Sequence, residues 1–283
     1  RDVLAKECPP SLIRAVADDA HRDGAGHDAT DGVAALWTTL VGLDWPGLAV
    51  EPAAGGSGAT AVELAILLEQ LGHVADPTPF LATTTQYVPL VQASTDDDQR
   101  RRLLGAVVAG GTGTLALAGP EGRWDPAAPP VRARRAADGW VLSGSASFVL
   151  DGDRADALAV LAATDDGPIA VVVPAEGVTA SRQPAFDPTL HVTTVDLTGA
   201  PVAADRVLAV DDPVAATTAA LEVATTGLAL GTVGACQRAF DLALAYSRER
   251  HQFGVPIGSF QALKHKLVDL YTQIERARAL GYF

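Results

Sequence analysis

Residues 246–270, with the sequence YSRERHQFGVPIGSFQALKHKLVDL, decide the fold of this 283-residue chain. They place Arg250 three residues before Phe253, ahead of a Gly-Val-Pro turn, and return to a helical pattern at Phe260-Gln261. A guanidinium is a permanent planar donor that suits a diphosphate, and a neighbouring aromatic ring can cover a flat base. The alternative is a helix end with an exposed arginine cluster followed by a turn. The residue types alone leave this alternative open.

Composition narrows the class of protein. The chain is 48% hydrophobic, enough for a large core, and its net charge is −13. Phosphate binding needs clustered cations, and no Lys/Arg-rich block occurs, so we expect no nucleic-acid partner. Cys8 and Cys236 belong to no C-x-x-C motif, which favours a reduced, cytoplasmic protein without disulfides or zinc. We also expect no signal peptide and no membrane span.

The two ends of the sequence are unusual. It begins with Arg1 and contains no methionine, and the helical pattern from Arg276 runs to Phe283 without a cap signal. We therefore expect a piece of a longer chain. Omission of the methionines from the sequence would explain why it contains none.

Residues 1–111 are expected to form a helical domain. An apolar stripe at helical spacing supports this, and Gly72 after it predicts a C-terminal cap; the stripe is Leu64, Leu67, Leu68 and Leu71. Residues 55–58, GGSG, lack the Gly-Lys-Ser/Thr ending of a phosphate-binding loop, so they predict a turn. Ser94 or Thr95, followed by aspartates, predicts a further helix start.

Residues 112–212 are expected to form a β domain. Short β-rich runs alternate with turn signals at 137–139 and 165–167. The predicted strands are 114–118, 131–135, 140–143, 157–162, 169–173 and 192–202.

Residues 213–283 are expected to be helical again and to form an incomplete C-terminal bundle. Two apolar stripes predict bundle packing: Val233, Cys236, Phe240 and Leu244, then Phe260, Leu263, Leu267, Leu270 and Ile274. The fold class is therefore α+β, with helices, a β-barrel-like domain and helices in that order.

The 246–270 run closely resembles the signature of the acyl-CoA dehydrogenase family, and the order of domains is that of the family's fold. The resemblance implies an FAD-dependent oxidoreductase that acts on a CH–CH bond, by α,β-dehydrogenation of an acyl-CoA. It also implies that Arg250, Gln252, Phe253, Phe260 and Gln261 bind the pyrophosphate and adenosine half of FAD across a subunit interface.

The family's contacts to the flavin ring are missing. Where members have Thr-Glu-Pro, this chain has Ala118 and Gly119 before Pro120, and the family's Trp-Ile-Thr/Ser falls on residues 148–150, FVL. Phe148 could still stack on the ring, but Leu150 has no donor. We therefore expect this β domain not to hold its own flavin, with stacking and backbone bonds alone as the alternative.

The catalytic base is missing too, so we assign no catalytic residue. The position of the Glu base in some members is Ala224, and the Arg that follows is Thr225. Glu222 lies roughly 200° around a helix from Ala224, so it should face elsewhere. Other members place the base in C-terminal helices outside this sequence. The six histidines, at 21, 27, 73, 191, 251 and 265, show no ligand spacing, and no metal site is expected.

The sequence, including residues 4–15 (LAKECPPSLIRA) and 186–197 (FDPTLHVTTVDL), looks like the shorter subunits of actinobacterial α2β2 acyl-CoA dehydrogenases of steroid and cholesterol catabolism. This implies a heterotetramer with a second dehydrogenase subunit, an acyl-CoA substrate derived from a steroid, and an electron-transfer flavoprotein or other acceptor. Two alternatives remain open. One is a self-sufficient homotetramer with its base in helices outside this sequence, and the other is a catalytically silent scaffold or CoA-ester-binding subunit.

Overall fold

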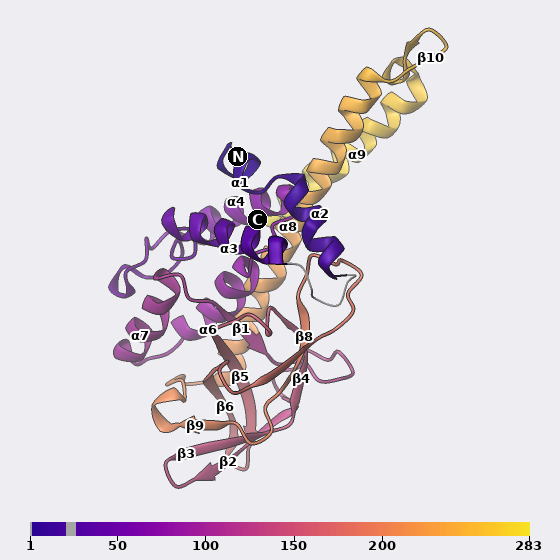
Figure 1. The fold of residues 1–283 in the computed structure, drawn as a ribbon. Coiled ribbons are helices and arrows are strands. Elements are labelled where there is room, and N and C mark those ends of the chain that lie inside the picture. Colours follow the sequence, from indigo (N-terminus) through magenta and orange to yellow (C-terminus); the bar gives the residue numbers. More distant parts are fainter. Residues whose placement is uncertain (1, 21–26) are drawn as a thin grey trace.

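The computed structural model describes residues 2–20 and 27–283, and it shows a body of helices and sheets from which a long helical arm projects (Figure 1). The N-terminal helices are α1 (Asp2–Glu7), α2 (Pro10–Ala20), α3 (His27–Gly42), η1 (Pro52–Ala54), α4 (Ala61–Val74), α5 (Phe80–Ala82), the π-helical turn η2 (Thr83–Tyr87), α6 (Val88–Gln92) and α7 (Asp97–Val108).

The middle part contains β1 (Gly113–Ala116), β2 (Val131–Ala136), β3 (Gly139–Ser143), β4 (Ser145–Leu150), β5 (Ala157–Thr164), β6 (Gly167–Pro174), β7 (Thr179–Arg182), β8 (Val192–Asp196), β9 (Pro201–Ala203) and η3 (Ala204–Arg206). The C-terminal part contains α8 (Pro213–Glu249), β10 (His251–Gln252), β11 (Val255–Pro256), η4 (Ile257–Ser259) and α9 (Gln261–Tyr282).

Helix α4 shows how the N-terminal helices form. Thr60 and Glu63 make a reciprocal capping box at its start, and the predicted leucine stripe is buried. The prediction that Gly72 caps this helix is wrong, because α4 continues to Val74 and Ala75 takes the left-handed cap conformation at φ 56°. Gly72 instead lies against Gly231 of α8, where an added Cβ would overlap the Gly231 carbonyl group. The glycine therefore serves a close helix crossing.

Helix α7 begins slightly later than predicted. The Asp96 carboxylate accepts hydrogen bonds from the backbone N–H groups of Asp98 and Gln99, so Asp96 is the N-cap. Ser94 is buried and donates to Gln99 Oε1 at 2.7 Å. The acidic run thus marks the start of the helix, and the buried Ser94 hydroxyl stabilises its first turn through the hydrogen bond to Gln99.

The middle part consists of two sheets with a shared core. In the larger sheet β5 pairs parallel with β1, antiparallel with β6 and at its end with β2, and the order continues through β3 to β9. The smaller sheet is β4–β8–β7. Aliphatic side chains such as Val131, Val171 and Val195 fill the core between them. Side chains of η2 cover the open edge of β1, since Thr83 Oγ1 accepts from Gly113 N at 3.2 Å.

Three strand predictions need correction. Strands β4 and β7 were not predicted, because β4 mixes buried and exposed residues without clean alternation and β7 has no buried residue. The predicted single strand at 192–202 is two strands in different sheets, β8 and β9. The chain turns between them at Gly199, where φ is 83°.

Helix α8 is long and apolar enough, by length and composition alone, to cross a membrane, with a mean hydropathy of 1.4 over an 18-residue window. The sequence predicted no such span. In the structure α8 lies along α4, and Gly231 and Gly234 fit closely against the backbone of that helix. A single helix of this kind is weak evidence for a membrane span, and 28% of that window is buried against the rest of the described chain.

Helices α8 and α9 run side by side and form the arm, with β10 at its far end (Figure 1). The predicted apolar stripes are only partly covered. Leu263, Leu267 and Ile274 are half-buried between the two helices, whereas Cys236 and Leu270 are exposed. The arm leaves these positions open because, in this chain, its two helices have little besides each other to pack on.

Candidate functional site

The end of the arm is a tight β-hairpin built from the signature residues. Helix α8 ends when Arg250 turns into extended backbone, and Ile257 N donates to Arg250 O at 2.8 Å. Strands β10 and β11 then pair antiparallel. Phe253 and Gly254 form the turn with φ of 55° and 82°, the two positive values that a two-residue hairpin favours. Phe253 is a bulky residue in a strained conformation, which is a feature found at functional sites.

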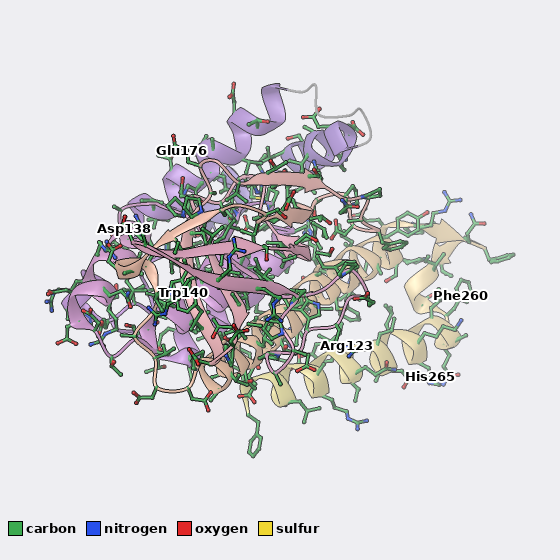
Figure 2. The ribbon with its side chains drawn as sticks, turned by 90° about the horizontal axis from the view of Figure 1, so that it is seen from below. Arg123, Asp138, Trp140, Glu176, Phe260 and His265 are labelled. Atoms are coloured by element: carbon green, nitrogen blue, oxygen red, sulfur yellow. The ribbon has the colours of Figure 1, made fainter. Side chains whose placement is uncertain are left out.

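All five predicted cofactor-binding residues gather at this end, and all are exposed. Phe253 is 93% exposed, and its ring meets the Phe260 ring edge-on with centroids 6.1 Å apart. Gln252 Nε2 donates to His251 O at 2.9 Å, and Gln261 begins α9. The arm therefore offers a guanidinium, amides and an aromatic pair to a ligand or a neighbour. Figure 2 shows Phe260 and His265 on this projecting end, away from Asp138, Trp140 and Glu176 of the β domain.

The arm end is locally basic although the chain is strongly acidic. Four exposed cationic residues lie within residues 246–266, Arg248, Arg250, Lys264 and Lys266, and the carboxylate in this segment is Glu249; Asp269 follows one turn later on α9. The chain as a whole carries −13. Local cations against a negative background give the arm end its own attraction for an anionic group.

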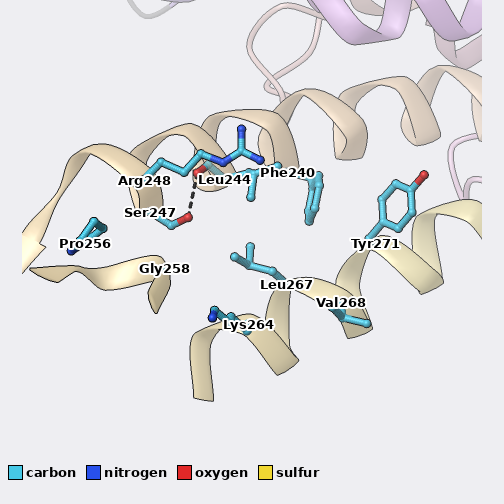
Figure 3. Close-up of a pocket in the computed structure, with 10 residues that line it drawn as sticks. All are labelled: Phe240, Leu244, Ser247, Arg248, Pro256, Gly258, Lys264, Leu267, Val268 and Tyr271. Carbon is cyan, nitrogen blue, oxygen red and sulfur yellow. Dashed lines mark hydrogen bonds between the residues drawn. The ribbon is translucent and has the colours of Figure 1, made fainter. Parts of the chain in front are cut away.

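A groove of about 530 Å³ lies between α8 and α9 behind the hairpin (Figure 3). Apolar side chains including Phe240, Leu244 and Leu267 line it, with Arg248 and Lys264 among its polar residues. Ser247 is buried there and donates to Leu244 O at 2.8 Å. A Cβ at Gly258 would press on the Ser247 carbonyl oxygen at 2.9 Å, so this glycine lets the hairpin fold back on α8.

The two segments expected to face a flavin ring do lie together on the β domain. Ser147 N donates to Ala118 O at 2.8 Å, which joins the residues before Phe148 to the end of the first strand. Ala118 is fully buried and Leu150 is half-buried, and neither offers a side-chain donor. The two segments are therefore adjacent, as a flavin-ring site requires, but the side chains of Ala118 and Leu150 provide no hydrogen-bond donor to the ring.

Phe148 is the exception on that surface. It lies in a β-bulge between β4 and β8, with φ at 57°, and its side chain is 43% exposed. Bulges re-aim side chains and occur often beside active sites. A Cβ on Gly122 would touch the Phe148 ring at 3.4 Å, so the loop before β2 packs beside it. An aromatic ring is thus presented to the outside.

No carboxylate occupies the expected position of the base on α8. Ala224 is half-buried there, and Thr225 donates to its own helix at Leu221 O, 2.7 Å away. Glu222 is exposed, as its position around the helix predicted.

We expect Glu222→Gln to change kcat by less than about twofold, because an exposed carboxylate on another face of the helix takes no part in proton transfer. Initial rates of the assembled enzyme with an acyl-CoA would measure this. A loss of 100-fold or more, the size typical of a removed general base, would contradict the assignment.

A half-buried acidic group, Asp76, lies where the helical part meets the β domain. Asp76 accepts hydrogen bonds from Thr78 N at 3.2 Å and Thr78 Oγ1 at 2.8 Å. Arg154 joins the two parts, donating to Pro77 O at 2.7 Å and to Asp151 Oδ1 at 2.8 Å. Burial raises the pKa of the Asp76 carboxyl from 3.8 to about 7.

This pKa predicts a pH dependence of stability. Between 3.8 and about 7 the folded state holds the Asp76 proton while the unfolded chain has released it, so stability falls as pH rises. The residue is partly accessible to water, so we expect less than about 1.4 kcal/mol per pH unit. Urea unfolding at two pH values within this window should show the slope, and Asp76→Asn should reduce it. An equal slope in Asp76→Asn would contradict the assignment.

The histidines make separate contacts. His73 Nε2 lies 3.4 Å from Asp241 Oδ2, and His191 Nδ1 lies 3.0 Å from Asp153 Oδ2. His21 lies outside the described residues, as does the side chain of His27. Among residues that are described, no group of three or more His, Cys, Asp or Glu side chains is arranged to hold a metal.

Comparison with known proteins agrees with this architecture. Residues 1–111 match the acyl-CoA dehydrogenase N-terminal domain, and residues 214–283 match the acyl-CoA dehydrogenase C-terminal domain. The acyl-CoA dehydrogenase IpdE2 of Mycolicibacterium smegmatis is 30% identical over 281 residues, covering 98% of this chain and 71% of that protein.

Two solved structures extend the comparison. The Tcur3481-Tcur3483 steroid ACAD is 32% identical, with a TM-score of 0.78 over 99% of this chain and 77% of that one. The ChsE4-ChsE5 complex from Mycobacterium tuberculosis has a TM-score of 0.79 at 24% identity over 98% of this chain and 76% of that one, which shows the shared fold.

Helices, two sheets and a helical arm that ends in this hairpin define a class of flavoprotein oxidoreductases. Members of the class act on CH–CH bonds. The chain belongs to the acyl-CoA dehydrogenase family, whose enzymes are FAD-dependent.

The sequence did not reveal the residues that hold the arm to the body. Glu69 of α4 is 6% exposed and binds Arg278 of α9, which is 209 residues away in the chain. The available signal was a charged residue directly after the buried Leu67-Leu68 pair. Its partner could not be found from local pattern.

Proposed function

We propose that this chain is one subunit of a heteromeric acyl-CoA dehydrogenase and that its arm end completes the FAD site of a neighbouring subunit. One observation carries the proposal. Arg250 and Phe253 flank β10, which lies at the far end of the arm, away from β4, the strand that contains Phe148 (Figure 1). Residues so placed can serve a cofactor that another subunit holds.

The chemistry of the arm end fits the pyrophosphate and adenosine half of FAD. Arg250 would bind the diphosphate as a charged planar donor, and Gln252 and Gln261 would donate hydrogen bonds beside it. Phe253, supported by Phe260, would cover the adenine. When bound, FAD accepts the β-hydrogen of the thioester as hydride; the arm's part is to bind and orient it.

The β domain of this chain fits the flavin ring poorly. Ala118 and Leu150 offer no donor toward a ring, and Ala224 cannot take a proton. We infer that this chain supplies neither the base nor a complete flavin site, and that the partner subunit supplies both. We also propose the division into residues 1–111, 112–212 and 213–283 as the three domains.

For the substrate we propose the CoA thioester of a bulky, steroid-derived acyl group, since a steroid dehydrogenase is among the relatives above 30% identity. Ala224 and Thr225, in place of larger charged groups, leave room for it. An electron-transfer flavoprotein or similar carrier would reoxidise the cofactor in the cytoplasm.

A second candidate is a self-sufficient homo-oligomer. The exposed Phe148 in its bulge favours this reading, because it presents a stacking surface on the chain's own β domain. In that case both the ring site and the arm end would come from copies of this chain.

Mixing distinguishes the two candidates. The full-length protein and its co-encoded partner subunit would be purified separately and assayed with steroid-derived and short-chain acyl-CoA thioesters and an artificial electron acceptor. We expect activity after mixing only, and with the bulky thioester. Full activity of this protein alone would establish the second candidate instead.

A further inference from the structure

A network of side chains joins three helices at the base of the arm. The Glu69 carboxylate of α4 accepts a hydrogen bond from Arg278 Nε at 2.9 Å and another from the Tyr282 hydroxyl at 2.9 Å. Arg278 also donates to Gln237 Oε1 of α8 at 2.9 Å and pairs with Glu275. One buried carboxylate of the body therefore holds α9 directly and α8 through Arg278.

The same network continues along α8. Gln237 Nε2 donates to Asp241 Oδ1 at 2.8 Å, and the other oxygen of Asp241 faces His73 of α4. Gly234 lies three residues before Gln237 on α8, and a Cβ added there would overlap the Glu69 carbonyl group. Helices α4 and α8 thus cross closely, and hydrogen bonds between charged and amide side chains hold them in one orientation. In some proteins buried ionic groups specify the orientation of packed elements more than they add stability.

Because the network lies at the base of the arm, a small change of angle there produces a larger displacement at the arm end. From Gln237 to Glu249 helix α8 extends about 18 Å at 1.5 Å per residue. A tilt of about 10° at the base would therefore move the hairpin by about 3 Å. Displacements of that size disrupt binding groups that must meet a ligand in a fixed geometry.

We propose that Glu69, Arg278 and Tyr282 are positioning residues that fix the angle between the arm and the body, so that the hairpin meets the FAD of the neighbouring subunit. The identity of the ligand rests on the proposed function, whereas the control of the angle does not.

Spin-label distances measure the angle without any cofactor. Labels at Val62→Cys on α4 and Val255→Cys on β11, both exposed positions, would be placed in a Cys236→Ser background, since Cys8 is buried. We expect one narrow distance distribution in this parent. Glu69→Ala should shift or broaden it by about 3 Å or more, Tyr282→Phe less, and Glu69→Gln least because it retains an acceptor. Arg101→Ala, which removes an exposed ion pair on α7, is the matched control and should change nothing.

The second readout is FAD retained by the complex with the partner subunit. We expect Glu69→Ala to lower it about tenfold and Glu69→Gln to restore most of it. Unchanged distances in Glu69→Ala, or changed distances with full FAD content, would overturn the inference. If Glu69→Ala does not fold, Tyr282→Phe decides by the same criteria. Full FAD content in Arg250→Ala would instead refute the proposed function and leave the distance result standing.

Discussion

Arg250→Ala should weaken the binding of FAD to the assembled enzyme while leaving the fold of this chain intact. Arg250 is exposed at the arm end and makes no side-chain contact within the described chain that the fold depends on. A hydrogen bond to a charged group contributes about 1.5–3 kcal/mol, so FAD affinity should fall about 10- to 150-fold. Equilibrium dialysis of the complex against FAD, with circular dichroism as the check of folding, measures both effects.

Two further variants separate geometry from charge at this site. Arg250→Lys retains the charge but loses the planar fork, so its affinity for FAD should lie between those of Arg250→Ala and the parent. Arg248→Ala removes the same charge two residues earlier and should have little effect. Equal losses in Arg248→Ala and Arg250→Ala would mean that the arm end attracts FAD by overall charge, contrary to the assigned role.

Gly72→Ala should destabilise the protein strongly. Helices usually gain about 1 kcal/mol from Gly→Ala, but here the added Cβ would overlap the backbone carbonyl of Gly231 on the crossing helix. Neither backbone can move aside without separating α4 from α8, so we expect a cost near the upper end of overpacking, about 3 kcal/mol. The midpoint of urea unfolding measures this.

The matched control is Gly42→Ala. Gly42 also lies in a helix and is exposed, and nothing lies within 4 Å of an added Cβ there. This variant should be neutral or slightly more stable. If both variants unfolded at the same urea concentration, the close crossing of α4 and α8 would not be a feature of the protein.

The sequence predicted features that leave a local pattern. The order of helices, strands and helices followed from periodicity, and a turn between two helices followed from the run of signature residues. The two short strands β10 and β11 in that turn were not predicted. Helix ends were harder to predict, because a glycine can either cap a helix or allow another helix to pack closely against it. Gly72 follows an apolar stripe as a cap would, and only the presence of Gly231 across the crossing reveals its other use.

Features that depend on distant residues were beyond the sequence. The link from Glu69 to Arg278 joins residues 209 apart, and no spacing rule connects them. The bulge that exposes Phe148 depends on how β4 pairs with β8, which was itself not predicted. The gathering of Arg250, Phe253 and Gln261 was predictable because all three lie in one short segment, residues 250–261, on and around the hairpin.

The most direct test of the shared-site account is the flavin content of the purified protein, alone and with its partner. The full-length protein would be prepared both ways, and FAD per chain would be determined from absorbance and protein concentration. The account predicts a colourless protein alone and one FAD per pair of chains in the complex. One FAD bound per chain in the protein alone would contradict it, because the chain would then hold a complete flavin site without a partner.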